Sequence, residues 1–174
     1  SVNYKIPLGV GVTRKDIQFT AESTLINVSA PKIFQDKNFS EGELTVKVNS
    51  KKVDIRGIGK LGGEHARLVW EEYFDEKRDK PIYFELSGKL TAKDIIGSLP
   101  TQLLNQKQKI ISGSGDYVIK ANLKPDFSGI AVMSVDLEGL KIDIPEFDWT
   151  KPANSNGIAK ITVRLSDKGL VEFK

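Results

Sequence analysis

The chain of 174 residues contains no cysteine, one histidine and one methionine. The lack of cysteine excludes disulfides, thiolate metal sites and a cysteine nucleophile. A histidine-ligated metal would need carboxylates beside His65, and a Ser-His-Asp triad would have to use this one residue. Because His65 follows a glycine pair and lies between Glu64 and Arg67, we interpret it as part of a solvated loop. We therefore expect no catalytic residue and no metal site.

Long apolar runs and blocks of like charge are also missing. No stretch approaches the roughly 20 apolar residues of a membrane span, and the N-terminus is neither a signal peptide nor an initiator methionine. The 26 basic and 23 acidic residues are mixed along the chain, which argues against a nucleic-acid partner. We expect residues 1–174 to form a single domain of a longer protein, because the chain starts at Ser1 and ends in an apparent strand.

The dominant pattern that is present is period-two alternation of apolar and polar residues. Residues 44–48 and 53–55 alternate on either side of a polar turn and predict a hairpin, and residues 82–86 and 117–123 alternate in the same way. Residues 130–137 are apolar on both parities, so we expect both faces of that strand to be covered. Roughly nine or ten strands follow from this pattern. The intervals are too short for repeated helical crossovers, so the sheet should be mainly antiparallel.

One segment carries helix signals. Thr91 can cap a helix with Asp94 three residues later, and apolar residues follow at helical spacing, but Gly97 and Pro100 weaken its middle. We expect a short helix that breaks near Pro100. Residues 64–73 are ambiguous and are predicted as a strand. The predicted fold class is mainly β, a curved and largely antiparallel sheet forming an open groove or an incomplete barrel or sandwich, with one short helix.

A G-x-G-x-x-G sequence at Gly57–Gly62 raises the alternative of dinucleotide binding, with Glu85 placed downstream where a ribose-binding acid could lie. The preceding strand of such a fold is buried on both faces, yet Lys52, Asp54 and Arg56 alternate charge through this one. The helices that a doubly wound sheet needs are also missing. The sequence favours glycines at a turn or bulge, and we expect no cofactor.

Two other features admit both a functional and a structural explanation. Acidic residues gather in 71–76, but basic residues follow at once in 77–80 and the spacing matches no calcium loop, so a polar loop is favoured. Trp70 and Trp149 could stack on a ligand, although aromatic residues that pack the core at strand ends are commoner.

Several short sequence motifs resemble those of a known protein family. They are LSGKL at residues 86–90, ISGSGDY at 111–117, LEGL at 137–140 and IPEFDWTKP at 144–152, with the short helix after Thr91 between the first two. In this order they resemble the AsmA-like domain of large bacterial envelope proteins, the AsmA, TamB and YhdP group.

The resemblance implies a periplasmic chain of β-repeats, anchored to the inner membrane at its N-terminus and curved into a trough with an apolar inner face. It implies a section of an envelope protein that binds or conducts phospholipid between inner and outer membranes, without enzymatic activity. The implied partners are phospholipid acyl chains, flanking β-repeats of the same chain and the inner membrane, through an anchor that this sequence lacks. Such transport favours interchangeable apolar residues over fixed polar ligands.

The apolar positions of the alternating strands are the candidates to line such a groove. We expect them to be Ile82, Phe84, Leu86, Ile119, Ala121, Leu123, Ile130, Val132 and Ile142. The same positions would also suit the closed core of a β-sandwich. Two further alternatives stay open: a structural or protein-interaction β-repeat module in envelope biogenesis that uses its sheet edges and has no ligand of its own, and an enzyme of unrecognised type.

Overall fold

The computed structural model of the chain describes residues 1–5, 9, 13, 18–34, 36–75, 77–97, 111–144, 148–166 and 169–173. These residues form twelve strands and one short helix, which confirms the predicted fold class. The elements are β1 (Val2–Lys5), β2 (Gln18–Phe34), β3 (Lys37–Asn49), β4 (Lys52–Leu61), β5 (Glu64–Tyr73), β6 (Ile82–Thr91), α1 (Ala92–Gly97), β7 (Ile111–Leu123), β8 (Gly129–Asp136), β9 (Leu140–Ile144), β10 (Trp149–Lys151), β11 (Ile158–Ser166) and β12 (Gly169–Phe173).

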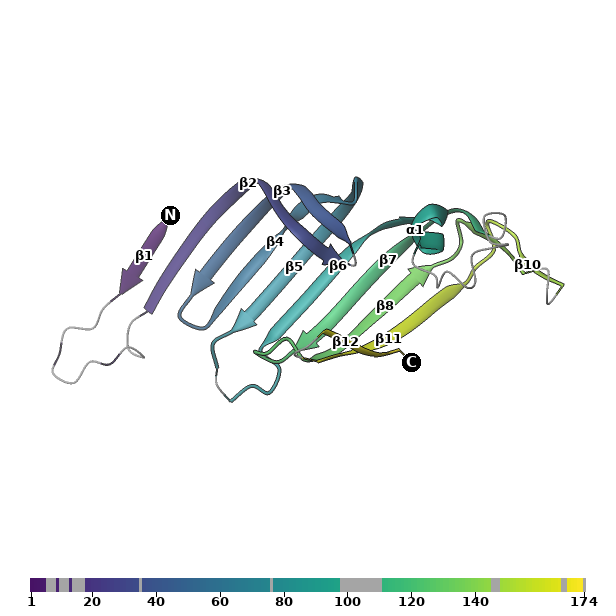
Figure 1. Cartoon of the computed structure of the whole chain (residues 1–174). Helices are drawn as coiled ribbons and strands as arrows, with labels where there is room; N and C mark the ends of the chain where they lie inside the picture. The colour runs from purple at the N-terminus through teal and green to yellow at the C-terminus, as the bar shows by residue number, and fades with distance from the viewer. Residues whose placement is uncertain are drawn as a thin grey trace.

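Ten of the strands lie side by side in nearly the order of the chain, β1 to β8 followed by β11 and β12, and each pairs antiparallel with its neighbours (Figure 1). Strand β9 pairs with the first residues of β7, and β10 pairs with β9, so these two strands lie off the main path. The sheet is curved and does not close into a barrel. Short connections between sequential strands explain this topology, because hairpins join antiparallel neighbours without crossovers.

The predicted hairpins and the ambiguous strand are confirmed. Strands β3 and β4 pair through Val46 opposite Ile55, and the Asn49 side chain accepts hydrogen bonds from the backbone N–H of Lys51 (2.8 Å) and Lys52 (3.0 Å) in the turn between them. Strand β5 has the bounds predicted for residues 64–73. It carries His65, whose side chain is exposed, so the prediction that His65 lies in a loop is wrong.

Helix α1 begins where the capping signal predicted. The backbone N–H of Thr91 donates to Oδ2 of Asp94 (2.9 Å), and the backbone N–H of Asp94 donates to Oγ1 of Thr91 (3.3 Å). This reciprocal pair satisfies donors at the start of the helix. The predicted break near Pro100 lies outside the described residues.

The glycine-rich motif belongs to a hairpin. Gly57 and Gly59 lie within β4, which is antiparallel to both β3 and β5 and is followed by a strand, and Gly62 lies in the turn with φ +60°. A Cβ at Gly59 would lie 2.4 Å from the Phe39 ring. The glycines therefore make room for Phe39 and for a tight turn, in an arrangement unlike the parallel strand and helix that bind a dinucleotide.

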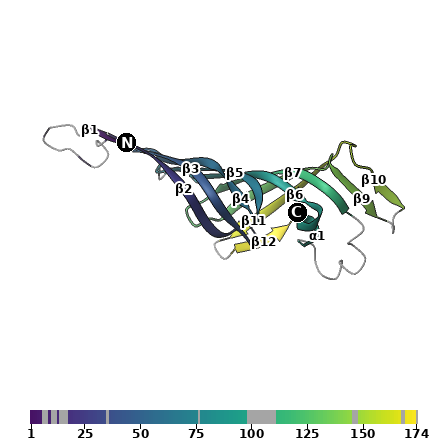
Figure 2. The ribbon, with the colours of Figure 1, turned by 90° about the horizontal axis from the view of Figure 1, so that it is seen from above.

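Strands β2 and β3 bend sharply near their shared end. Asn27 in β2 and Glu41 in β3 have φ of 58° and 51°, and the register of both pairings shifts at these points. Such bulges turn the strand direction. The bent ends fold over the sheet, and Figure 2 shows them on the same side of it as α1 and β12.

Candidate functional site

The register of the strands divides the side chains of the sheet into two sets. Leu86 lies opposite Leu68 on one neighbouring strand and Ile119 on the other, whereas the next residue, Ser87, lies opposite Arg67 and Val118. Directly opposed residues share a face, and successive residues of a strand point to opposite faces. The alternation seen in the sequence therefore separates two surfaces of different chemistry.

One surface, which we name the apolar face, runs without a break from β3 to β11. On the described main-path strands from β3 to β11, the charged residues in its register are Lys37 at the start of β3, and Glu64 and Glu72 near the two ends of β5. Its larger members are Leu44, Val46, Val48, Val53, Ile55, Leu68, Trp70, Ile82, Phe84, Leu86, Tyr117, Ile119, Leu123, Met133, Val135, Ile161, Val163 and Leu165.

The apolar face is buried at its centre and accessible around it. Leu86 is 0% exposed and Ile119 is 6% exposed, because they pack among residues of neighbouring strands. Ile55, Leu68 and their neighbours on this face are only half-buried. No second sheet covers the face among the described strands, since all of them belong to one connected sheet. Hydrocarbon surface therefore remains available for contact with another apolar molecule.

Helix α1 and the bent ends of β2 and β3 cover one rim of the apolar face, which we call the helix rim. Ile95 of α1 packs against the central cluster, and Phe39 is 2% exposed. Lys37 Nζ lies 2.5 Å from Asp94 Oδ1 and joins the β2–β3 end to the helix. Burial opposes the ionisation of Asp94, but hydrogen bonds from Lys37 and Thr91 outweigh it and lower its pKa.

Aromatic rings mark the opposite rim, which we call the loop rim. It comprises the β3–β4 turn, the β5–β6 loop, the β7–β8 turn and the adjoining ends of β1 and β2. The Trp70 ring lies edge-on to Phe84 at 6.2 Å and contacts Phe127 at 6.1 Å between centroids. Phe127 has φ +62° in the β7–β8 turn and is 55% exposed. No helix lies over this rim among the described residues, so the apolar face is more open here.

The other surface, the polar face, carries ion pairs. Arg56 Nε lies 2.7 Å from Asp54 and Lys52 Nζ lies 3.0 Å from it, while Glu71 accepts from both cations. Hydrogen bonds from Arg56 and then Lys52 lower the pKa of Asp54 to about 2, although burial opposes this. Glu71 thus belongs to a strand network, which corrects the prediction that the acidic group around it forms a loop.

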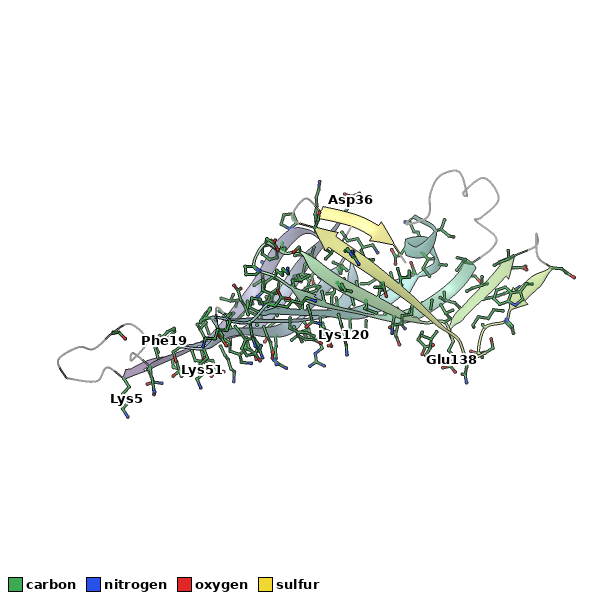
Figure 3. The ribbon with its side chains drawn as sticks, turned by 90° about the horizontal axis from the view of Figure 1, so that it is seen from below. Lys5, Phe19, Asp36, Lys51, Lys120 and Glu138 are labelled. Atoms are coloured by element: carbon green, nitrogen blue, oxygen red, sulfur yellow. The ribbon has the colours of Figure 1, made fainter. Side chains whose placement is uncertain are left out.

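Figure 3 shows the relation of the two faces to the curvature. Lys120, a polar-face residue of β7, lies on one side of the sheet, and Asp36 in the bent β2–β3 end lies on the other. The bent ends of β2 and β3 and strand β12 rise from the sheet on the side of Asp36. The apolar face is therefore on the inner side of the curve.

Six of the nine predicted groove residues lie together on the apolar face. Five of the six are buried, so they form the centre of the face, and Phe84 alone is half-exposed. These six are Ile82, Phe84, Leu86, Ile119, Ala121 and Leu123.

The register corrects the placement of two of the other three. Val132 lies opposite Lys120 and Ile130 lies opposite Asn122, so both are on the polar face, and Ile130 is 41% exposed. The first residues of β8 are apolar at both odd and even positions, so the sequence could not reveal which of them lie on the apolar face. The prediction that both faces of this strand are covered is also wrong, because Ile130 is exposed and most of its other residues are only half-buried. Ile142 belongs to β9, off the main path of the sheet, where it pairs with Lys151 of β10 and with Ile111 of β7, so its place in a groove stays a prediction.

Several accessible residues of the apolar face were missed as groove candidates. Ile55 was assigned to a hairpin, and Leu68 and Trp70 lie in the segment whose strand assignment was ambiguous. Aligning the alternating residues of β4 and β5 with those of β6 would have placed these residues on the apolar face, since Trp70 lies opposite Phe84. Trp149 lies on β10 and is 48% exposed.

Comparison of the chain with protein-family models, with curated proteins and with solved structures found no match. Within the described ranges, no cluster of three or more histidine, cysteine or carboxylate side chains is placed to hold a metal ion. The helical part of the described chain includes nothing long and apolar enough to span a bilayer.

Proposed function

We propose that this chain binds the acyl chains of phospholipids on its apolar face, as one section of a β-groove, and catalyses no reaction. The observation that supports the proposal is the unbroken apolar face from β3 to β11 on the inner side of a curved, open sheet. A sandwich would bury such a face under a second layer, whereas here Ile55, Leu68 and Phe84 stay half-exposed.

The energetics of hydrocarbon transfer suit this face. Each methylene removed from water is worth about 0.8 kcal/mol, so an acyl chain of about sixteen carbons needs on the order of 10 kcal/mol of apolar shelter to leave a bilayer. Many similar aliphatic and aromatic side chains can supply that shelter without holding the chain at one point. The charged residues in the register of the apolar face on the described main-path strands from β3 to β11, Lys37, Glu64 and Glu72, lie near strand ends. Lipid could therefore slide across the strands.

The cellular setting in this proposal rests on the resemblance of the sequence phrases to AsmA-like domains. On that basis the chain acts in the periplasm, within a protein anchored to the inner membrane, and carries phospholipid toward the outer membrane. Flanking β-repeats would continue the groove beyond β1 and β12, the two edge strands of the main path.

Two isoleucines of β4 offer a matched test. Ile55 is half-buried on the apolar face, and Ile58, three residues later, is 59% exposed on the polar face. Purified, delipidated protein should bind a fluorescent fatty acid, and native mass spectrometry should detect phospholipid on protein that has not been delipidated. Ile55→Asp should abolish both signals and Ile58→Asp should leave them unchanged.

Circular dichroism and unfolding by urea would establish that both variants fold. The proposal is overturned if folded Ile55→Asp binds fatty acid as well as the unchanged chain does, or if no lipid binds the unchanged chain at all.

The edge of β2 supports a second candidate function, the addition of a partner strand. In the described residues β1 pairs only with Gln18–Ala21, so most of β2 has a neighbour on one side alone, and Ile26 on it is 79% exposed. An open strand edge can pair with another β-segment. A chain that self-associates or captures an extended peptide while binding no fatty acid would favour this candidate.

A further inference from the structure

The loop rim brings together segments that are distant in the sequence. The backbone N–H of Phe74 in the β5–β6 loop donates to the carbonyl of Lys51 in the β3–β4 turn (2.8 Å), and Lys124 in the β7–β8 turn lies 3.6 Å from Asp79 of that loop. Figure 1 shows these connections along one edge of the sheet, and Figure 3 shows Lys5 and Phe19 near Lys51.

The exposed phenylalanines of the protein gather at this rim. Phe19, Phe74 and Phe127 are 36%, 48% and 55% exposed, and they are the only phenylalanines that are exposed among the side chains the structure describes. Phe19 lies at the start of β2, Phe74 in the β5–β6 loop and Phe127 in the β7–β8 turn, whereas Phe39 and Phe84 are buried or half-buried. Packing within the sheet does not explain three rings in water along one edge.

Basic residues outnumber acidic ones around these rings. The described residues 5, 50–52, 74–75, 77–81 and 124–128 contain seven lysines and arginines against three aspartates. Lys124 is paired with Asp79, and Lys52 is paired with Asp54 and Glu71 of the polar face. Lys51, Lys77 and Lys80 are exposed. The rim thus combines apolar rings with an excess of positive charge.

We propose that the loop rim docks on the surface of a bilayer containing anionic phospholipid. Side chains with apolar rings enter the boundary between headgroups and acyl chains, and nearby lysines are attracted to the negative surface potential. A binding site for an acidic protein would account for the lysines but not for the three exposed rings. Because Phe127 also contacts Trp70 on the apolar face, docking here would place the open rim of that face against the lipid.

Co-sedimentation of the chain with vesicles tests this proposal. The chain should bind vesicles of phosphatidylcholine mixed with phosphatidylglycerol more tightly than vesicles of phosphatidylcholine alone, and salt should weaken the binding. Lys77→Glu should lower the partition coefficient about fivefold or more, and Phe74→Ser should lower it by a similar factor. The matched controls, Lys160→Glu and Ile158→Ser, change exposed residues of β11 away from the rim and should bind as the unchanged chain does.

The proposal is overturned if the unchanged chain ignores the anionic lipid, if the rim variants bind like the unchanged chain, or if the controls lose as much binding. Its failure is distinguishable from failure of the proposed function. Lys77→Glu and Phe74→Ser should keep the binding of fatty acid in solution, and folded Ile55→Asp should keep the binding of anionic vesicles.

Discussion

The two faces of this sheet consist of the same strands but are stabilised in different ways. The apolar face buries Leu86 completely by packing it among neighbouring strands. The polar face, one residue away along each strand, relies on pairs such as Arg56 with Asp54. The difference shows how a single layer can keep one side accessible to hydrocarbon: its centre is packed, its surroundings stay half-exposed, and its few charged residues lie near strand ends.

The largest expected effect comes from placing a charge at adjacent positions of β6. Leu86→Asp should lower the free energy of unfolding by more than about 4 kcal/mol, because it buries an unpaired carboxylate at a site that is 0% exposed. Ser87→Asp, on the polar face, should change it by less than about 0.5 kcal/mol. Urea unfolding followed by circular dichroism measures both. Similar losses at the two positions would break the distinction between the faces.

A methyl group at Gly59 should have the next largest effect. Gly59→Ala brings a Cβ to 2.4 Å from the Phe39 ring, and it should cost about 1–3 kcal/mol of stability. If crowding is the cause, Phe39→Leu should offset part of that cost, with a coupling of at least about 0.5 kcal/mol in a double-mutant cycle. Strictly additive effects would contradict this explanation.

The contribution of the polar face to the free energy of unfolding should depend on pH. The pKa of Asp54 in the folded chain is about 2, below its ordinary value of 3.8, so its ionised form stabilises the fold above about pH 4. That contribution is lost as the pH falls toward about 2. Asp54→Asn should therefore be less stable than the unchanged chain at neutral pH, and the gap should narrow across this window. Urea unfolding at a series of pH values measures the gap, and a constant gap would be inconsistent with the shifted pKa.

The bridge between Lys37 and Asp94 should have the smallest effect on global stability. Lys37→Met keeps most of the apolar stem, and it should cost at most about 1 kcal/mol because both side chains are partly exposed. Hydrogen exchange should accelerate at the bent end of β2 and β3 and leave the centre of β6 unchanged. Faster exchange throughout β6 would show that the bridge supports the whole sheet.

Much of the fold could be predicted because alternation and turn chemistry are local. The hairpin around Asn49, the capping pair of Thr91 and Asp94, and the strand at residues 64–73 are each specified by residues within about ten positions of one another. Charged residues that alternate before the glycines of β4 led to an antiparallel sheet, which is correct, and Gly62 lies in a turn as predicted, whereas Gly57 and Gly59 lie within the strand.

The site was harder to predict because it depends on register. Leu86 and Ile119 were placed on the correct face, but their complete or near-complete burial makes them the packed centre of the face. The accessible residues Ile55 and Leu68 are recognised only when β4 and β5 are aligned with β6. Around Ile130 and Val132, odd- and even-numbered positions are both apolar, so the sequence does not show which of them lie on the apolar face. The pairing of Ile130 with Asn122 and of Val132 with Lys120 places both on the polar face.

The proposed binding of hydrocarbon is tested most directly by the two tryptophans, which are the only ones in the chain. Trp70 contacts Phe84 on the apolar face, and Trp149 is 48% exposed on β10. Fluorescence of Trp149→Phe and Trp70→Phe should be measured with phospholipid that carries bromine on its acyl chains, a short-range quencher. We expect strong quenching in Trp149→Phe, which retains Trp70, and little in Trp70→Phe. Equal quenching of both variants, or none in Trp149→Phe, would contradict binding of acyl chains on the apolar face.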